Sequence, residues 1–293
     1  MIGIDWGTTS LRAYRLAGRI VLDRRDRPSG ITKIAPDAFP DTLRDLVADW
    51  LAAGETHILM AGMVGSRQGW VEAPYLQCPA DPVALATALT KIPFGTIKLA
   101  IVPGLTHRDP AGTPEVMRGE ETQLAGAIAT TPDAVFCLPG THSKWATVQR
   151  GIVTGFSTAM TGEIFAALRG HTILGRMMAE GPHDDDAFRR GVARARTEGG
   201  LLHHLFGVRT LGLFGELADT AAPAYLSGLL IGTEIAAVGP TSPIHSPVQL
   251  IGEPALCRLY TLALAEFGLQ THLQPPDLAA TGLALIAEHA RWT

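Results

Sequence analysis

Two short segments combine a glycine turn with hydroxyl side chains, a pattern that suits phosphate binding. Residues 5–10, DWGTTS, follow an apolar run with the character of a strand. The glycine, Gly7, lets backbone N–H groups approach phosphate oxygens closely, and Thr8 and Thr9 add hydroxyl donors. Asp5 stands at the strand end, where its carboxylate could hold Mg²⁺ through the water shell of the ion. The same residues also suit an ordinary turn with a solvated aspartate, so this segment alone leaves both interpretations open.

The second segment repeats much of the first. The sequence GTTSLRA at 7–13 aligns with GTHSKWA at 140–146, and each copy joins two predicted strands. We interpret the repeat as two related phosphate loops, one in each of two lobes. Lys144 adds a cation that could neutralise phosphate charge. For His142, a structural role as a hydrogen-bonded turn residue is favoured over contact with a ligand. The candidate nucleotide contacts are Gly140, Thr141, Ser143 and Lys144.

Two adjacent acids precede the second loop. Glu120 and Glu121 lie in RGEETQ, at the predicted start of a helix. A carboxylate near an acceptor hydroxyl can take its proton during phosphoryl transfer, whereas acids at this position also simply favour the helix dipole. Adjacent helical residues point about 100° apart, so one acid is expected to face a site squarely.

A glycine-rich segment, AGMVGSRQGW, follows a predicted buried strand. Such a loop can line a polar pocket, and the guanidinium of Arg67 could bind a carboxylate in bidentate fashion. The alternative is a structural loop with one packed aromatic side chain. Glu163 either caps a helix or points at sugar hydroxyls. The candidate substrate contacts are Gly65, Ser66, Arg67, Trp70, Glu120 and Glu163.

A strand-to-helix turn at Gly252 and Glu253 could hold an adenosine against glycine backbone, or it could be an ordinary turn. Other nucleotide and hydrolase motifs are absent: the chain has no GxxxxGK[ST], GxGxxG, GxSxG or HExxH.

The elements expected around these residues alternate between strands and helices, which predicts an α/β fold. Strands are expected on both sides of each loop, and also at HILMAG, KLAIVPG, VFCLPG and VQLIG. Amphipathic helices are expected between and after these strands. Pro132 separates a helix from a new strand. We therefore predict an N-terminal lobe over 1–132 with the first phosphate loop and the substrate loop, and a C-terminal lobe over 133–293 with the second phosphate loop and the adenosine site.

The composition and charge of the chain argue against nucleic-acid and membrane partners. With a net charge of −4 and scattered basic residues, the 293-residue chain is not expected to bind nucleic acid or an anionic membrane. No apolar stretch is long enough to span a bilayer, and the start lacks the features of a signal peptide. Three well-separated cysteines favour neither disulfides nor a zinc site, which predicts a cytoplasmic protein. A small-molecule substrate is expected, and a homodimer is left open.

Taken together, the segments resemble the 2-dehydro-3-deoxygalactonokinase family, sugar-acid kinases of the actin/hexokinase-like superfamily. The resemblance rests on IGIDWGTTSLRAY, AGMVGSRQGWVEAPYLQCPA, VMRGEETQLAGA, LPGTHSKW, TAMTGE and YLSGLLIGTEIA. It implies a two-lobed ribonuclease-H-like fold with ATP in the cleft between the lobes. It also implies Mg²⁺-dependent transfer of a phosphoryl group from ATP to the 6-hydroxyl of 2-dehydro-3-deoxy-D-galactonate, giving the 6-phosphate and ADP in galactonate breakdown.

The order of a Gly-Glu-Glu helix, a strand and a phosphate loop is also similar to exopolyphosphatases of this superfamily. There the second glutamate is the base, which implies Glu121 as the catalytic base here, with Asp5 as catalytic metal ligand. Many superfamily members open the second phosphate loop with an aspartate, whereas this chain has Leu138. Metal binding is therefore expected to rest on Asp5. A kinase of a related 2-keto-3-deoxy sugar acid, an exopolyphosphatase-like hydrolase and a non-catalytic ATP-binding regulator are the alternatives.

Overall fold

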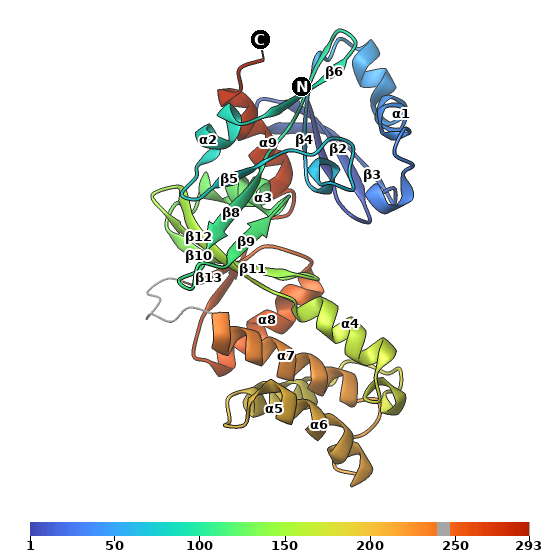
Figure 1. Ribbon diagram of the computed structural model, residues 1–293, viewed down its shortest axis with the longest axis vertical. Coiled ribbons are helices and arrows are strands. Elements are labelled where there is room, and N and C mark those ends of the chain that lie inside the picture. The colour runs from blue at the N-terminus through green and yellow to red at the C-terminus, as the bar shows by residue number, and fades with distance from the viewer. Residues whose placement is uncertain (239–246, 293) are drawn as a thin grey trace. The chain divides into compact units, whose positions relative to one another are not determined.

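The computed structural model describes residues 1–238 and 247–292, which form two compact units (Figure 1). Unit 1 consists of Met1–Asp133, Thr147–Phe156 and Pro275–Thr293, and unit 2 of Ala134–Ala146 and Ser157–Gln274. Each unit has its own apolar core around its own sheet. The α/β class predicted from the sequence is confirmed.

A mixed six-stranded sheet forms the centre of unit 1. Its strand order is β3-β2-β1-β4-β7-β6, in which β1 pairs with β2 antiparallel and with β4 parallel. The strand β1 is apolar because both of its faces are covered, whereas β3 at the edge is mostly exposed and rich in charge. The bounds are β1 (Ile2–Trp6), β2 (Leu11–Ala17), β3 (Ile20–Arg27), β4 (His57–Ala61), β6 (Thr90–Phe94) and β7 (Ile97–Ile101).

Unit 1 also holds a small three-stranded sheet and helices that cover the larger one. The small sheet has the order β5-β8-β9, from β5 (Tyr75–Gln77), β8 (Gly104–Arg108) and β9 (Pro114–Met117). The α-helices are α1 (Phe39–Ala52), α2 (Pro82–Thr87), α3 (Glu120–Ile128) and α9 (Leu278–His289), with 3₁₀ turns at Ile31–Lys33 and Met63–Gly65.

The C-terminal helix α9 belongs to unit 1, which differs from the single lobe boundary expected after Pro132. It packs against α3 and β1 (Figure 1). The helix pair is unusually close, because a Cβ atom on Gly282 would lie 1.8 Å from the Thr122 carbonyl and one on Gly126 would lie 2.2 Å from the Leu278 carbonyl. Glycine at both positions lets the two backbones touch. The first segment of unit 1 ends at Asp133, and the assignment of 1–132 and 133–293 to two lobes stays a prediction.

Unit 2 is built on a five-stranded sheet of order β12-β11-β10-β13-β14. Its strands are β10 (Ala134–Leu138), β11 (Ser143–Gln149), β12 (Ile152–Ala159), β13 (Val248–Leu250) and β14 (Thr271–Leu273), and the outer parts of β11 and β12 belong to unit 1. Its helices are α4 (Thr161–His171), α5 (Asp185–Ala195), α6 (Gly200–Leu213), α7 (Ala222–Val238) and α8 (Pro254–Glu266), with a 3₁₀ turn at Gly175–Met177.

Helix α7 is apolar on all sides because it is the central helix of unit 2. It packs against α4, α5, α6 and α8 (Figure 1). A helix without a polar face is stable only when it is buried all round. Even so, none of the helices described here is both long and apolar enough to cross a membrane.

The two main sheets share one plan. Numbered from the first strand of each sheet, the order 3-2-1-4-5 occurs in β3-β2-β1-β4-β7 and again in β12-β11-β10-β13-β14. In both sheets the fourth strand runs parallel to the first and the fifth parallel to the fourth. The two glycine-hydroxyl loops therefore occupy the same position, between strands one and two, as the internal sequence repeat predicts.

Candidate active site

The first loop is held from behind by a second stretch of chain in unit 1. The Ile31 N–H donates to the Gly7 carbonyl at 3.0 Å, and the Thr32 hydroxyl donates to the Thr8 carbonyl at 2.9 Å. Gly30 passes so close that a Cβ atom there would lie 2.2 Å from the Thr8 carbonyl oxygen. Thr8 and Thr9 remain exposed. The loop is thus a supported turn with its hydroxyl side chains available to a ligand.

Asp5 lies where three elements meet. It is the next-to-last residue of β1, and Arg12 Nη1 lies 3.2 Å from its Oδ2. A Cβ atom on Gly62, after β4, would lie 3.4 Å from Asp5 Oδ1, and one on Gly119, before α3, would lie 3.4 Å from the Cα of Gly62. Burial raises the pKa of Asp5, while the Arg12 cation partly offsets this effect.

The two adjacent acids have different surroundings. Glu121 is 1% exposed: its Oε2 accepts the Gly119 N–H at 2.6 Å and its Oε1 accepts the Thr122 hydroxyl at 2.9 Å. Burial, with the charge of Glu120 as the second cause, raises the pKa of Glu121 to about 8. Glu120 is half-buried, accepts the Arg118 N–H at 3.0 Å, and acts electrostatically on Asp5. Asp5, Glu120 and Glu121 therefore form one acidic cluster.

The predicted substrate loop is a tightly packed turn. Gly65 is buried, and the Ser66 hydroxyl donates to the Met63 carbonyl at 2.8 Å. Trp70 stacks on Phe39 with ring centroids 6.4 Å apart, so it is part of the core of unit 1. Arg67 is the exposed member: its side chain is 86% exposed, with Nε 3.0 Å from Glu72 Oε1. Its assignment as the carboxylate contact stays a prediction.

Arg118 is a buried cation beside the predicted site, and no sequence motif marked it as a site residue. It is 8% exposed, its guanidinium lies 4.4 Å from the centroid of the Tyr75 ring, and Nη2 donates to the Ala73 carbonyl at 2.6 Å. Its Nε and Nη1 have no hydrogen-bond partner within the described part of the chain. Arg118 therefore braces the end of the substrate loop beside the acidic cluster.

In unit 2, the side chains of the second loop divide into an exposed and a buried set. Thr141 and His142 are exposed, and His142 Nε2 bonds to Glu163 Oε2 on α4. Ser143 is fully buried and bonds to the Tyr260 hydroxyl at 2.7 Å. Lys144 is also buried, and its ammonium donates to the His142 carbonyl at 2.8 Å. Their hydroxyl and ammonium groups thus have partners inside unit 2, and their assignment as nucleotide contacts stays a prediction.

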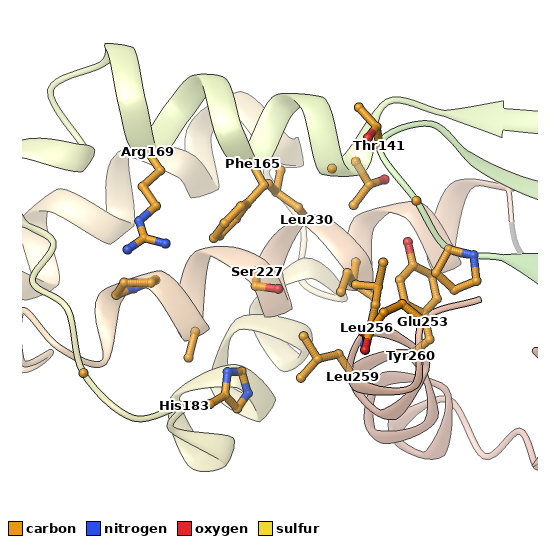
Figure 2. Close-up of a pocket in the computed structure, with 18 of the residues that line it drawn as sticks. Thr141, Phe165, Arg169, His183, Ser227, Leu230, Glu253, Leu256, Leu259 and Tyr260 are labelled. Carbon is orange, nitrogen blue, oxygen red and sulfur yellow. The ribbon is translucent and has the colours of Figure 1, made fainter. Parts of the chain in front are cut away.

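A cavity of about 610 Å³ opens beside this loop. Its polar end is formed by Gly140 and Thr141 of the loop together with Thr161 and Gly162 at the start of α4. Figure 2 shows the apolar wall, in which Phe165 of α4 and Leu230 of α7 face the pocket together with Leu256 and Leu259 of α8. Arg169, His183 and Ser227 also line the cavity.

The predicted adenosine turn borders this cavity in part. Glu253 is among the lining residues, but its carboxylate is the N-cap of α8 and accepts the Leu256 N–H at 3.0 Å. Gly252 is exposed and is not among the lining residues. The apolar wall itself carried no recognisable sequence motif, since leucines at helical spacing also mark any buried helix.

Glu234 is a second buried charged residue that was not among the predicted site residues. It is 4% exposed at the centre of unit 2, where Trp145 Nε1 donates to it at 2.8 Å and the Tyr260 hydroxyl at 2.7 Å. The signal for it was present, because Glu234 is the single charged residue in the apolar run Ala222–Val238.

The repeated strand order, with a glycine-hydroxyl loop between the first and second strands of each sheet, is typical of the actin/hexokinase-like fold. This fold is shared with component A of the (R)-2-hydroxyglutaryl-CoA dehydratase of Acidaminococcus fermentans, with a TM-score of 0.54 over 99% of this chain and 98% of that one at 13% identity. At that identity the similarity concerns the fold alone.

Closer relatives carry one enzyme name. A Rhizobium meliloti protein named as a 2-dehydro-3-deoxygalactonokinase is 39% identical over 99% of this chain and 96% of its own length. The Escherichia coli 2-dehydro-3-deoxygalactonokinase is 35% identical over 95% and 94%. A crystal structure of a Sinorhizobium meliloti protein of the same description superposes with a TM-score of 0.90 at 38% identity, covering 98% of both chains.

The sequence model of the 2-keto-3-deoxy-galactonokinase family matches residues 5–286. The chain belongs to this family of sugar-acid kinases. The family resemblance and the enzyme class predicted from the sequence are thus confirmed.

Proposed function

We propose that this protein transfers the γ-phosphoryl group of ATP to the 6-hydroxyl of 2-dehydro-3-deoxy-D-galactonate, producing the 6-phosphate and ADP. The observation that carries the proposal is the identity of 39% and 35% to two relatives that bear this enzyme name over nearly their whole length. The reaction would belong to carbohydrate metabolism, as a step in the breakdown of galactonate.

The cavity in unit 2 is the proposed site of the adenosine and phosphates of ATP. Its volume of about 610 Å³ is in the range typical of small-molecule sites. Apolar side chains on α4, α7 and α8 offer a surface for the purine ring. The backbone of Gly140 and Thr141 and the Thr141 hydroxyl lie at the other end, where the phosphates would bind. The first loop, with Gly7, Thr8 and Thr9, is the second proposed phosphate contact.

Mg²⁺ is the proposed metal, and Asp5 is the residue that would hold it. Within the described residues there is no group of three or more His, Cys, Asp or Glu side chains arranged for a metal ion. This fits Mg²⁺ in kinases, which is usually held by one or two carboxylates together with substrate phosphates and water. Asp5 and Glu120 supply such carboxylates. When bound, the ion neutralises the charge of the transferring phosphate.

The general base is proposed to come from the acidic cluster, with Glu121 as the residue predicted from the sequence. With a pKa of about 8, Glu121 is mostly protonated at neutral pH, so the fraction that can act as a base grows as the pH rises toward 8. Its oxygens, however, already accept two hydrogen bonds and are buried, whereas Glu120 on the same turn is half-buried. Side-by-side measurement of kcat for Glu120→Gln, Glu121→Gln and Glu163→Gln separates the three candidates.

The decisive experiment measures ADP release with and without the keto acid. The proposal expects ADP formation that requires the acid and yields a phosphorylated sugar acid. Release of phosphate without the acid would indicate an exopolyphosphatase-like hydrolase, and nucleotide binding without turnover would indicate a regulator. Comparing acceptors that differ at C4 distinguishes 2-dehydro-3-deoxy-D-galactonate from the gluconate-derived epimer.

The nucleotide pocket can be tested by filling it. Ser227 on α7 faces the cavity between its apolar wall and its polar lining (Figure 2). A phenyl ring at this position would occupy space needed by the nucleoside, so Ser227→Phe should weaken ATP binding about tenfold or more. Ser227→Ala removes the hydroxyl without filling the space and is the matched control. Equal ATP affinity for both variants in calorimetry would contradict the assignment.

The cytoplasm is the proposed location. Cys78, Cys137 and Cys257 are buried free thiols, and free thiols are typical of proteins kept in a reducing compartment. Cell fractionation checks this directly.

A further inference from the structure

The carboxylate of Glu234 connects three elements of unit 2. One oxygen accepts the indole N–H of Trp145 on β11 at 2.8 Å, and the other accepts the hydroxyl of Tyr260 on α8 at 2.7 Å. The same second oxygen accepts the hydroxyl of Thr161, the first residue of α4. All three donors converge on one side chain of the central helix.

Two of these three partners line the nucleotide pocket. Thr161 and Tyr260 line the pocket, whereas Glu234 is not among the lining residues. The Tyr260 hydroxyl also bonds to Ser143, the first residue of β11, at 2.7 Å. The network therefore reaches the strand that follows the second phosphate loop.

The start of α4 is attached to the loop itself. The Glu163 N–H donates to the Thr141 carbonyl at 3.0 Å. Gly162 lies so close that a Cβ atom there would be 2.6 Å from the Gly140 carbonyl oxygen. A shift of Thr161 would therefore move the loop backbone as well, because the two segments are in direct contact.

A buried carboxylate is costly unless its oxygens are hydrogen-bonded, and an apolar residue would fill the same space at lower cost. Burial raises the pKa of Glu234, and the bonds from Thr161, Tyr260 and Trp145 oppose that effect. An apolar residue could not accept the three hydrogen bonds by which Glu234 holds α4, β11 and α8 in fixed positions within this unit.

We propose that Glu234 is a positioning residue, which sets the second phosphate loop and the first turn of α4 in the geometry that receives the phosphates of ATP. It does so through Thr161, Tyr260 and Ser143 and without contact to the nucleotide. This inference rests on the proposed role of the pocket in ATP binding.

The test compares the binding of ATP and of adenosine to Glu234→Ala by calorimetry. We expect ATP affinity to fall about tenfold, in the range found when a supporting hydrogen bond behind a binding group is removed, and adenosine affinity to change less than about twofold. The KM for ATP should rise while the KM for the sugar acid stays close to wild type. A purely structural role would lower thermal stability without separating ATP from adenosine.

Two further variants complete the test. Glu234→Gln keeps an acceptor for Trp145 but replaces the oxygen that accepts two hydroxyls with an amide donor. It should therefore fold and bind ATP more tightly than the alanine variant, but about threefold more weakly than wild type. If the alanine variant does not fold, an ATP-specific loss of about threefold or more in Glu234→Gln supports the proposal, and an unchanged ATP affinity refutes it. Gln249→Leu is the control, because it removes another buried side-chain bond of unit 2, the 2.7 Å contact from Gln274.

The outcomes separate the two proposals. Failure of the wild-type protein to bind ATP would overturn the proposed function. ATP binding by the wild type with equal affinity in Glu234→Ala, or an equal loss in Gln249→Leu, would overturn the positioning role of Glu234 alone.

Discussion

Replacing Glu121 with glutamine should remove a pH dependence of folding stability that this buried acid imposes. The pKa of Glu121 is raised from 4.5 to about 8, chiefly by burial. Between these values the folded protein keeps the proton on Glu121, whereas the unfolded chain has lost it. The stabilising contribution of the proton is therefore fully present below about pH 4.5 and is lost as the pH rises toward 8.

The size of the effect follows from proton linkage. A single group of this kind changes the free energy of unfolding by about 1.4 kcal/mol per pH unit inside that window. From pH 5.5 to 7.5 the wild type should therefore lose at most about 3 kcal/mol through Glu121. Glutamine has the shape of the protonated acid, can accept the Gly119 N–H, and does not titrate.

The measurement is urea unfolding at pH 5.5 and 7.5, followed by tryptophan fluorescence. Four of the five tryptophans, at 6, 50, 70 and 292, belong to unit 1, which also contains Glu121. The relevant quantity is the difference in stability between wild type and Glu121→Gln, because other titrating groups cancel in it. This difference should shift by about 1–3 kcal/mol in favour of the variant as the pH rises.

The matched control is Glu120→Gln, one residue away. It leaves Glu121 in place, so most of the pH dependence should remain, reduced somewhat because the Glu120 charge is the second cause of the raised pKa. A difference between wild type and Glu121→Gln that is the same at both pH values would refute the argument that burial keeps Glu121 protonated.

Three other expectations concern the loops of unit 1. Asp5→Asn should reduce turnover by at least about 100-fold with the fold retained, since the loss of a metal-binding carboxylate costs several kcal/mol in the transition state; near-normal turnover at saturating Mg²⁺ would contradict the role. Gly30→Ala should lower the free energy of unfolding by about 3 kcal/mol and reduce activity, because the new Cβ would lie 2.2 Å from the Thr8 carbonyl oxygen. The control is Gly207→Ala in α6, where a new Cβ would have no neighbouring atom within 4 Å. It should change stability by less than about 1 kcal/mol in thermal melts. Arg67→Lys should raise the KM for the sugar acid much more than the KM for ATP. Because the residue is 86% exposed, stability should change by less than about 0.5 kcal/mol; equal effects on both KM values, or none, would leave Arg67 as a surface residue paired with Glu72.

Local sequence patterns were sufficient to predict most strands and the two equivalent loops. Runs such as IGID and VFCLPG predicted strands because apolar segments bounded by turn residues have few other stable conformations. The repeated Gly-Thr-x-Ser segments predicted two equivalent loops, and the fold confirms their equivalent positions between the first and second strands of two sheets. These features depend on residues close together in the chain, which is why they can be read from it.

Helix α6, Gly200–Leu213, was not predicted, because its polar and apolar residues show little separation into faces. The short strand β14 was also missed, since three residues carry too little pattern to predict a strand. Membership of α9 in unit 1 depends on glycines in α3 and α9 that are more than 150 residues apart in the sequence.

Which polar side chains face a ligand was decided by the tertiary structure. Ser143 and Lys144 belong to a loop motif, yet both are buried and bonded inside unit 2, Ser143 to a tyrosine 117 residues away. Arg118 and Glu234 lie in the family segments VMRGEETQLAGA and YLSGLLIGTEIA, but their burial follows from packing against distant strands and helices. A motif specifies which donors and acceptors are present, whereas their partners are set by long-range contacts that have no local signature.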